Sequence, residues 1–178
     1  ASHSARYLHM TPEMLKSNPE EYREKYINML GWPLSEYKPE LPVPEVEETF
    51  VATDEQSEIY RLKIKVMDNF NFYGLLFLPL DLNTDSVANG KRPLVIAQHG
   101  GGGTPELCSD MHGPNNYNHM VRKHIERGSV VFAPQLLLWN CNAAKERNPY
   151  YGDKYERAEI DRSLNQLGGS ITALEVFC

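Results

Sequence analysis

Hydrophobic and polar positions along residues 46–80 follow the pattern of β-strands. Every second residue from 60 to 66 is apolar and the residues between them are basic, a period of two that is typical of a strand with one buried face. After polar turn residues at 68–71, an almost continuous apolar strand runs over 72–78. The pattern therefore predicts an antiparallel hairpin or meander, followed by a polar loop at 81–92.

The apolar runs lose their alternation in the second half of the chain. Residues 93–98 and 129–134 are short apolar runs, as expected for strands buried on both faces. Between them, residues 117–125 carry apolar side chains at helical spacing. This order predicts the βαβα unit of a parallel sheet and, with the meander before it, an α/β fold. The last helix face is expected to consist of Ile160, Leu164, Leu167, Ile171, Leu174 and Cys178.

A helical arm is predicted before the sheet, over residues 11–30. Thr11 and Asn18 are each followed by proline, the pattern of an N-cap with proline at the first helical position. Residues 33–44 contain four prolines and are expected to form an extended strap. The predicted division of the chain is a helical arm with its strap, 1–45, and an α/β domain, 46–178.

Composition narrows the class of protein further. The 178 residues are 41% hydrophobic and 10% aromatic, which indicates a globular chain, and the net charge of −6 argues against nucleic acid as the main partner. No apolar run reaches the length of about 18 residues that a membrane helix needs. Three cysteines without metal-type spacing favour a reducing, cytoplasmic setting. Secretion stays open, because a signal peptide can be removed.

The strongest chemical signal is His99 followed by four glycines and Thr104, directly after a predicted buried strand. Glycines in a row are costly in chain entropy, so we expect a turn with positive φ or a close approach of backbone N–H groups to an anion. A mobile loop is the plain alternative. A phosphate loop would require a lysine that is missing here, and a dinucleotide fingerprint would require a helix to open at once, whereas we expect one only near Asn115. An oxyanion hole fits better, because neutral donors suit a charge that exists only in a transition state.

These elements together resemble the N-terminal half of the α/β-hydrolase fold. The segments FYGLLFLPL, KRPLVIAQHGGGG and ERGSVVFAP are similar to the acetyl xylan esterase-like and dienelactone hydrolase-like branch. The resemblance implies that Gly101 and Gly102 supply backbone N–H groups to an oxyanion hole. We expect His99 to orient this loop by hydrogen bonding. The implied activity is that of a serine esterase without a cofactor, acting on a small-molecule ester, with an acylated sugar as one candidate.

The chain departs from the family at the nucleophile. The family's serine lies in G-x-S-x-G on the next strand-to-helix turn, and no such motif occurs here. Ser170 follows two glycines but lacks the second flanking glycine, and it lies on the predicted last helix. We therefore expect the catalytic triad to lie outside this segment, which would be truncated before the nucleophile elbow. The alternative is a non-catalytic remnant that binds a partner or a small ligand, and a homo-oligomer is a possible consequence of its open sheet edge.

The loop after residue 134 is the second candidate region. Ligands of open α/β sheets bind at the carboxyl ends of the strands. Packing beneath the loop is the alternative role for its aromatic residues. The predicted substrate-binding residues are Gln135, Trp139 and Tyr150.

Histidines and cysteines near the glycines give no further site. His119 and His124 are five residues apart, off the spacing of two metal ligands on one helix face, so we predict no metal site. Cys108 lies beside the loop, but no partner base is evident for it, and a structural cysteine is the expected role.

Overall fold

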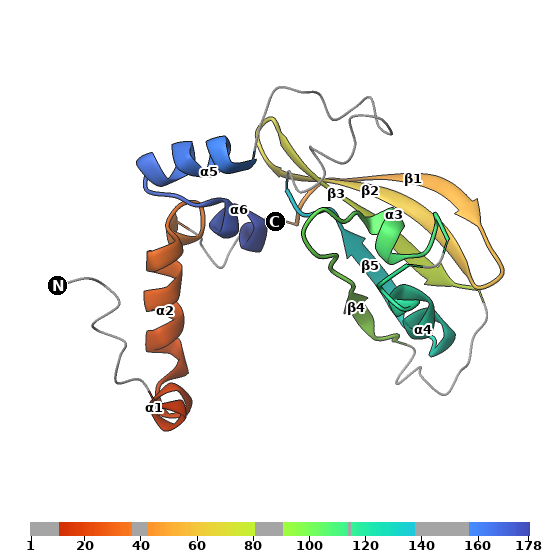
Figure 1. The fold of residues 1–178 in the computed structure, drawn as a ribbon, viewed down its shortest axis with the longest axis horizontal. Coiled ribbons are helices and arrows are strands. Elements are labelled where there is room, and N and C mark those ends of the chain that lie inside the picture. The colour runs from red at the N-terminus through yellow and green to blue at the C-terminus, as the bar shows by residue number, and fades with distance from the viewer. Residues whose placement is uncertain (1–10, 37–42, 81–90, 114, 138–156) are drawn as a thin grey trace. The chain divides into compact units, whose positions relative to one another are not determined.

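The computed structural model describes residues 11–36, 43–80, 91–113, 115–137 and 157–178 (Figure 1). They form two compact units. One contains the N-terminal helices together with residues 160–177, and the other contains the sheet with the helices packed on it. The predicted domain boundary between residues 45 and 46 stays a prediction.

The sheet unit contains five strands in the order β1-β2-β3-β5-β4. Strands β1, β2 and β3 form an antiparallel meander, β3 is antiparallel to β5, and β4 is parallel to β5. The predicted meander and the parallel pair are therefore confirmed, and the fold is a mixed α/β fold. The prediction that the first strand of the pair is buried on both faces is wrong: β4 is the outermost strand among the described residues, and its Leu94 and Ile96 are exposed at 62% and 66%. The strands are β1 Val46–Thr53, β2 Ser57–Met67, β3 Phe70–Pro79, β4 Leu94–Ile96 and β5 Val130–Pro134.

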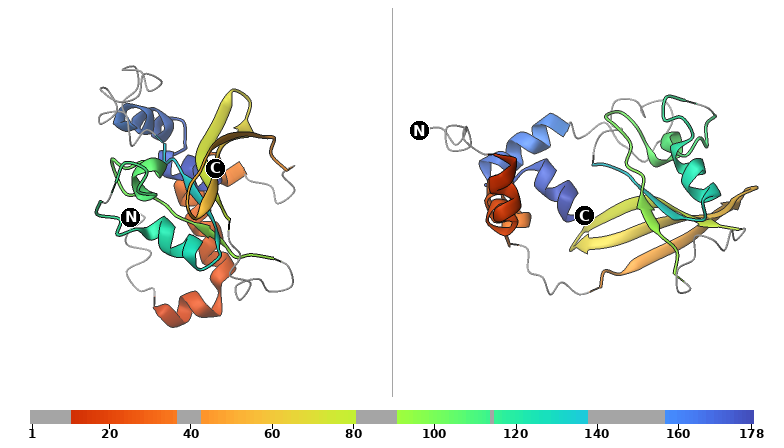
Figure 2. Two further views of the ribbon diagram at one scale, coloured as in Figure 1. Left: turned by 90° about the vertical axis from the view of Figure 1, so that its right-hand side faces the viewer. Right: turned by 90° about the horizontal axis from the view of Figure 1, so that it is seen from below.

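Helices α3 (Pro105–Cys108) and α4 (Met120–Glu126) lie on one face of this sheet (Figure 2). Apolar side chains that point from this face towards the helices are almost fully buried, and they form the core of the sheet unit. It includes Leu75, Phe77, Val131, Ala97, Cys108, Val121 and Ile125.

Helix α3 corrects the expectation that no helix begins before Asn115. Thr104 is its N-cap, and its hydroxyl accepts a hydrogen bond from the N–H of Leu107 at 3.2 Å. Pro105 occupies the first helical position, where its missing N–H costs nothing. The glycine loop therefore leads into a helix at once. The dinucleotide fingerprint still does not fit, because the position of its third glycine is occupied by Pro105 when the motif begins at Gly100 and by Glu106 when it begins at Gly101.

The helical unit starts with two short helices, both within residues 11–30, which were predicted to be helical. The Thr11 hydroxyl accepts a hydrogen bond from the N–H of Met14 at 3.3 Å and caps the first of them. The side chain of Asn18 donates to Glu21 but makes no capping bond to the backbone. Gly31 ends the second helix with a positive φ of 78°. The helices are α1 Pro12–Ser17, α2 Pro19–Leu30 and the 3₁₀ turn η2 Leu34–Glu36. The 3₁₀ turn corrects the start of the predicted extended strap, and residues 37–42 of that strap lie outside the described residues.

The last apolar stripe does not form a single helix, contrary to the prediction. Helix α5 (Arg157–Gln166) ends before two glycines, and α6 (Ile171–Phe177) begins after them. Gly168 has φ +80°, and Gly169 pairs with Trp32 in an isolated β-bridge. Because a helix cannot continue through this conformation, the chain turns and the regular spacing of the stripe is interrupted.

None of the described helices combines the length and the apolar character that crossing a membrane would require.

Candidate active site

Two loops meet at one edge of the sheet. Strands β4 and β5 are parallel, so both carboxyl ends lie at the same edge, and each is followed by a predicted site residue. His99 and Gln135 are both buried there. The side-chain amide nitrogen of Gln135 lies 3.1 Å from Nε2 of His99, and it also donates to the carbonyl of Leu136 at 2.8 Å. The structure therefore brings His99 and Gln135 together, while a role of Gln135 in substrate binding stays a prediction.

The hydrogen bonds of His99 define its tautomer. The backbone N–H of Leu136 donates to Nε2 at 3.0 Å, so Nε2 carries no proton. The proton therefore sits on Nδ1, which lies 2.8 Å from the carbonyl oxygen of Gly100 and donates to it. His99 connects the end of β5 to the first glycine of the loop. With both ring nitrogens engaged, the imidazole is placed to hold the loop rather than to accept a substrate proton.

The glycines form a tight turn. The N–H of Gly103 donates to the carbonyl of Gly100 at 3.0 Å. Of the two central residues, Gly102 and not Gly101 has a positive φ, at +73°, which is the pattern of a type II turn. A left-handed φ at the third position strongly favours glycine, so the sequence of the loop and its shape agree.

The two central N–H groups of this turn are available to a ligand. Gly101 and Gly102 are both exposed. Over the described parts of the chain, neither N–H meets a hydrogen-bond acceptor. A pair of backbone donors held in a fixed turn suits an oxygen that carries or develops negative charge.

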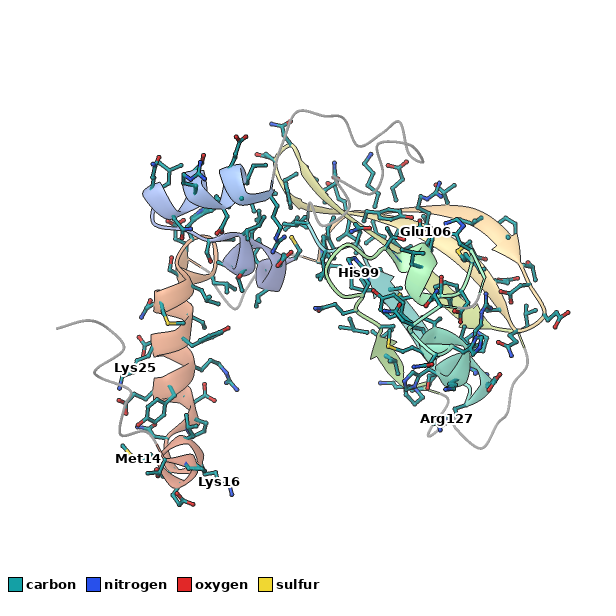
Figure 3. The ribbon with its side chains drawn as sticks, in the orientation of Figure 1. Met14, Lys16, Lys25, His99, Glu106 and Arg127 are labelled. Atoms are coloured by element: carbon teal, nitrogen blue, oxygen red, sulfur yellow. The ribbon has the colours of Figure 1, made fainter. Side chains whose placement is uncertain are left out.

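Helix α3 is tied to the sheet directly behind the loop. The hydroxyl of Tyr73, on β3, donates to the carboxylate of Glu106 at 2.5 Å. Burial and the neighbouring Glu106 carboxylate raise the pKa of Tyr73 well above its ordinary value of 10. Figure 3 shows His99 and Glu106 on the same stretch of chain, on either side of the glycine turn. Sequence reasoning missed both partners, because the pairing joins residues 33 positions apart.

Cys108 has the surroundings of a structural thiol. It is fully buried, and Sγ lies 3.4 Å from the carbonyl of Pro105 and 3.6 Å from that of Ala97. Burial, together with the Glu106 charge, raises the pKa of the thiol to about 12. A thiol with that pKa is not a nucleophile at neutral pH.

The remaining predicted residues and sites are less informative. Trp139 and Tyr150 lie outside the described residues. Within the described ranges, no group of three His, Cys, Asp or Glu side chains could hold a metal ion. His119 instead pairs with Asp110, at 2.9 Å between Nδ1 and Oδ2.

A groove of about 590 Å³ lies between the β1–β2 turn and α4. The β1–β2 turn leads into the first residues of β2, which pair with the last residues of β3. Because β3 is antiparallel to β5, the last residues of β3 lie beside the first residues of β5. The groove is therefore at the sheet edge opposite His99, and none of the predicted site residues lines it.

The chain has an α/β fold that is similar to that of a solved structure. This structure is of a Bacteroides fragilis protein with a provisional assignment as an acetyl xylan esterase. The TM-score is 0.63 at 14% sequence identity, over 95% of this chain and 42% of that chain. The likeness concerns the fold alone, and this chain spans less than half the length of that protein. A scan against protein-family models found no match. A search of curated proteins found none either.

Proposed function

We propose that this chain is the oxyanion-binding part of a carboxylic ester hydrolase that works by acyl transfer. The observation that carries the proposal is the pair of N–H groups at Gly101 and Gly102, which meet no acceptor among the described residues and are held in a type II turn at the carboxyl end of a parallel strand. Such donors stabilise the oxyanion of a tetrahedral intermediate, and each is worth about 3 kcal/mol of barrier. The fold shared with a provisionally assigned esterase supports the same class.

The α/β-hydrolase fold is the scaffold we propose. The strand order supports this proposal. The antiparallel meander β1-β2-β3 is followed in the sheet by the parallel strands β5 and β4, and the glycine turn comes after β4. In that fold the serine nucleophile lies on a sharp turn between a strand and a helix. Since the 178 residues contain no G-x-S-x-G motif, we propose that the nucleophile, acid and base come from residues outside this segment.

The reaction assigns distinct roles to the residues of the turn. The serine oxygen would attack the ester carbonyl while the base outside this segment takes up the hydroxyl proton, a C–O bond would form, and the carbonyl oxygen would take up negative charge between the two N–H groups. As the tetrahedral intermediate collapses, the ester C–O bond would break and the alcohol would leave with the proton returned by that base, which gives an acyl-enzyme. Water would then hydrolyse the acyl-enzyme by the same steps and release the acid. His99 fixes the turn through the carbonyl of Gly100. We propose a small ester as substrate, with an acylated sugar as one candidate, and Gln135, Trp139 and Tyr150 as the pocket residues.

The test begins with the natural protein that carries this sequence. We expect a fluorophosphonate probe to add once to that protein and to abolish hydrolysis of p-nitrophenyl acetate. Intact mass spectrometry and peptide mapping would locate the labelled serine. An unlabelled protein without esterase activity would contradict the proposal.

A pair of substitutions at one residue tests the oxyanion role itself. Gly101 occupies the first central position of the turn, where proline is well tolerated because φ there is about −60°. Gly101→Pro removes one N–H and should lower kcat about 100- to 1,000-fold, as the loss of one oxyanion-hole donor does. Gly101→Ala keeps the N–H and should lower kcat far less. Equal activity of the two variants would contradict the assignment.

A non-catalytic binding module of the same fold is the second candidate. The observation that favours it is that β4 is the outermost strand of the sheet among the described residues, with Leu94 and Ile96 exposed at 62% and 66%. An extended peptide could add to this edge as a further strand. Failure of the fluorophosphonate to label the natural protein would favour this second candidate.

A further inference from the structure

A side chain outside the predicted site holds the glycine turn. The hydroxyl oxygen of Tyr117, in the segment before α4, accepts a hydrogen bond from the N–H of Gly100 at 3.0 Å. We propose that Tyr117 is a positioning residue that keeps the Gly100–Gly103 turn in the shape that presents the N–H groups of Gly101 and Gly102. The catalytic consequence of this contact rests on the proposed esterase function, whereas the contact itself does not.

Tyr117 binds the backbone N–H of Gly100, whereas His99 binds its backbone carbonyl. The carbonyl of Gly100 already accepts hydrogen bonds from the N–H of Gly103 and from Nδ1 of His99. Tyr117 adds the bond to the N–H of the same residue. Gly100 therefore has both of its backbone polar groups engaged, which leaves its peptide units little freedom to rotate.

Gly103 shows how closely the tyrosine approaches the turn. A Cβ atom built at Gly103 would lie 2.4 Å from the Tyr117 hydroxyl and 3.0 Å from both the Gly100 carbonyl oxygen and Cβ of His99. The hydroxyl therefore lies against both ends of the turn, Gly100 and Gly103. This explains the fourth glycine of the run, which φ alone does not require.

Tyr117 is itself well anchored. Its N–H donates to the side-chain oxygen of Asn115 at 2.8 Å, and its carbonyl accepts from the N–H of Met120 at 3.1 Å, the first residue of α4. The ring is half-buried and packs against the core cluster. A rigid support of this kind is what a positioning residue needs, since a mobile side chain could not define the turn.

Tyr117→Phe in the full natural protein is the main test. The ring and its packing remain, and only the hydroxyl is lost. We expect amide hydrogen exchange at Gly100 to become about fivefold faster or more, because one net hydrogen bond is removed. We also expect kcat for p-nitrophenyl acetate to fall about three- to tenfold with KM unchanged. Tyr60→Phe is the matched control, because that hydroxyl bonds to Glu58 on a strand away from the loop.

A double-mutant cycle tests the close approach independently of activity. Gly103→Ala should destabilise the protein through the clash with the hydroxyl, and the same change should cost less when residue 117 is phenylalanine. Chemical unfolding of the wild type, the two single variants and the double variant gives the coupling free energy between residues 103 and 117. Purely additive effects would contradict the contact between Tyr117 and Gly103.

The outcomes separate this inference from the proposed function. If the natural protein has no esterase activity, the proposed function fails, and exchange at Gly100 together with the cycle still decides the role of Tyr117. If esterase activity is present and Tyr117→Phe changes neither Gly100 exchange nor kcat, the positioning role is wrong. Faster Gly100 exchange with a lower kcat and an unchanged KM supports both.

Discussion

At the scale of single residues, Cys108 shows how burial suppresses the nucleophilic reactivity of a side chain beside a candidate site. Its thiol lies among apolar core residues, and burial with the Glu106 charge raises its pKa to about 12. Below that pH the native thiol stays protonated. In the 178-residue chain, Cys141→Ser and Cys178→Ser leave Cys108 as the only cysteine, and this variant should resist iodoacetamide at pH 8 until it is unfolded. Mass spectrometry counts the added groups, and rapid labelling of the native protein would contradict a buried thiol.

The same shift makes stability depend on pH. The pKa of Cys108 is higher in the folded protein than its ordinary value of 9. The folded state therefore binds more protons than the unfolded chain between these values, and the contribution of the thiol to stability is present below pH 9 and is lost as pH rises towards 12. The difference in melting temperature between the wild type and Cys108→Ala should therefore shrink as pH rises from 9 towards 12. Tyr73 also has a raised pKa, so only the difference between the two proteins isolates the thiol.

The candidate site was predictable only in part. The position of His99 and the glycines at the end of a strand follows from the pattern of the chain, although that strand is not buried on both faces as predicted. Their proximity to Gln135 also follows, because the carboxyl ends of parallel strands lie at the same end of the sheet. The contact with Tyr117 was not predictable. Its place depends on the path of an irregular segment in which Asp110, Asn118 and His119 all have positive φ. No periodicity in the sequence encodes such a path.

At the scale of elements, two glycines decide where the helical unit bends. A Cβ at Gly31 would lie 2.1 Å from the carbonyl oxygen of Gly168, and φ of Gly31 is +78°. Gly168 also has a positive φ, but a Cβ there would meet nothing within 4 Å. Gly168→Ala should therefore cost about 1–2 kcal/mol of stability, from backbone strain alone. Gly31→Ala adds a backbone clash and should cost clearly more.

Circular dichroism at 222 nm during urea unfolding would rank the two variants. The expected order is wild type, then Gly168→Ala, then Gly31→Ala as the least stable. Equal stability of the two variants would mean that Gly31 and Gly168 do not meet as described.

The element boundaries show which sequence signals suffice. Thr104 followed by Pro105 is the same N-cap signature as Thr11 followed by Pro12, and it begins α3, yet the helix was missed because only one turn follows it. The apolar stripe of the last helix was misleading for the opposite reason. Its spacing continues across Gly168, but tertiary contacts with Trp32 and Gly31 select a left-handed conformation there.

An ion pair attaches α4 to the turn between β1 and β2. Arg122 bonds to the carboxylate of Asp54, which also accepts the N–H groups of Gln56 and Ser57 at 2.9 and 2.8 Å. Burial alone would raise the pKa of Asp54, but these hydrogen bonds and the Arg122 charge outweigh it and hold the pKa below the ordinary value of 3.8. The stabilising effect is thus present above pH 3.8 and is lost as pH falls through the lower, folded pKa.

Asp54→Asn tests this attachment. It should lower the unfolding free energy by about 1–2 kcal/mol at pH 7, since a charged hydrogen-bond partner is lost. The difference from wild type should shrink below pH 3.8. Glu47→Gln is the control, because the Lys63–Glu47 pair is exposed and such pairs contribute little. A difference between wild type and Asp54→Asn that stays constant down to pH 2 would contradict the role of the charge.

At the scale of the whole molecule, the two faces of the sheet differ in their cover. One face carries the core beneath α3 and α4 (Figure 2). On the other face, one residue from each strand contributes to a row of apolar cross-strand neighbours. The residues at the two ends of this row are exposed, Phe50 on β1 at 57% and Ile96 on β4 at 66%. Parallel strands are normally covered on both faces. The row consists of Phe50, Tyr60, Leu76, Phe132 and Ile96.

This row predicts how the 178-residue chain behaves in solution when it is produced alone. Exposed apolar area on a sheet face and a free strand edge both favour association between copies. We expect sedimentation to show a monomer that associates at higher concentration, and Leu94→Lys, beside Ile96 on the same face, to weaken the association. Leu167→Lys is the matched control, because Leu167 is 82% exposed but lies outside the sheet. If both variants associate like the wild type, the sheet face is not the contact surface. If the wild type is monomeric at every concentration, the exposed row does not drive association.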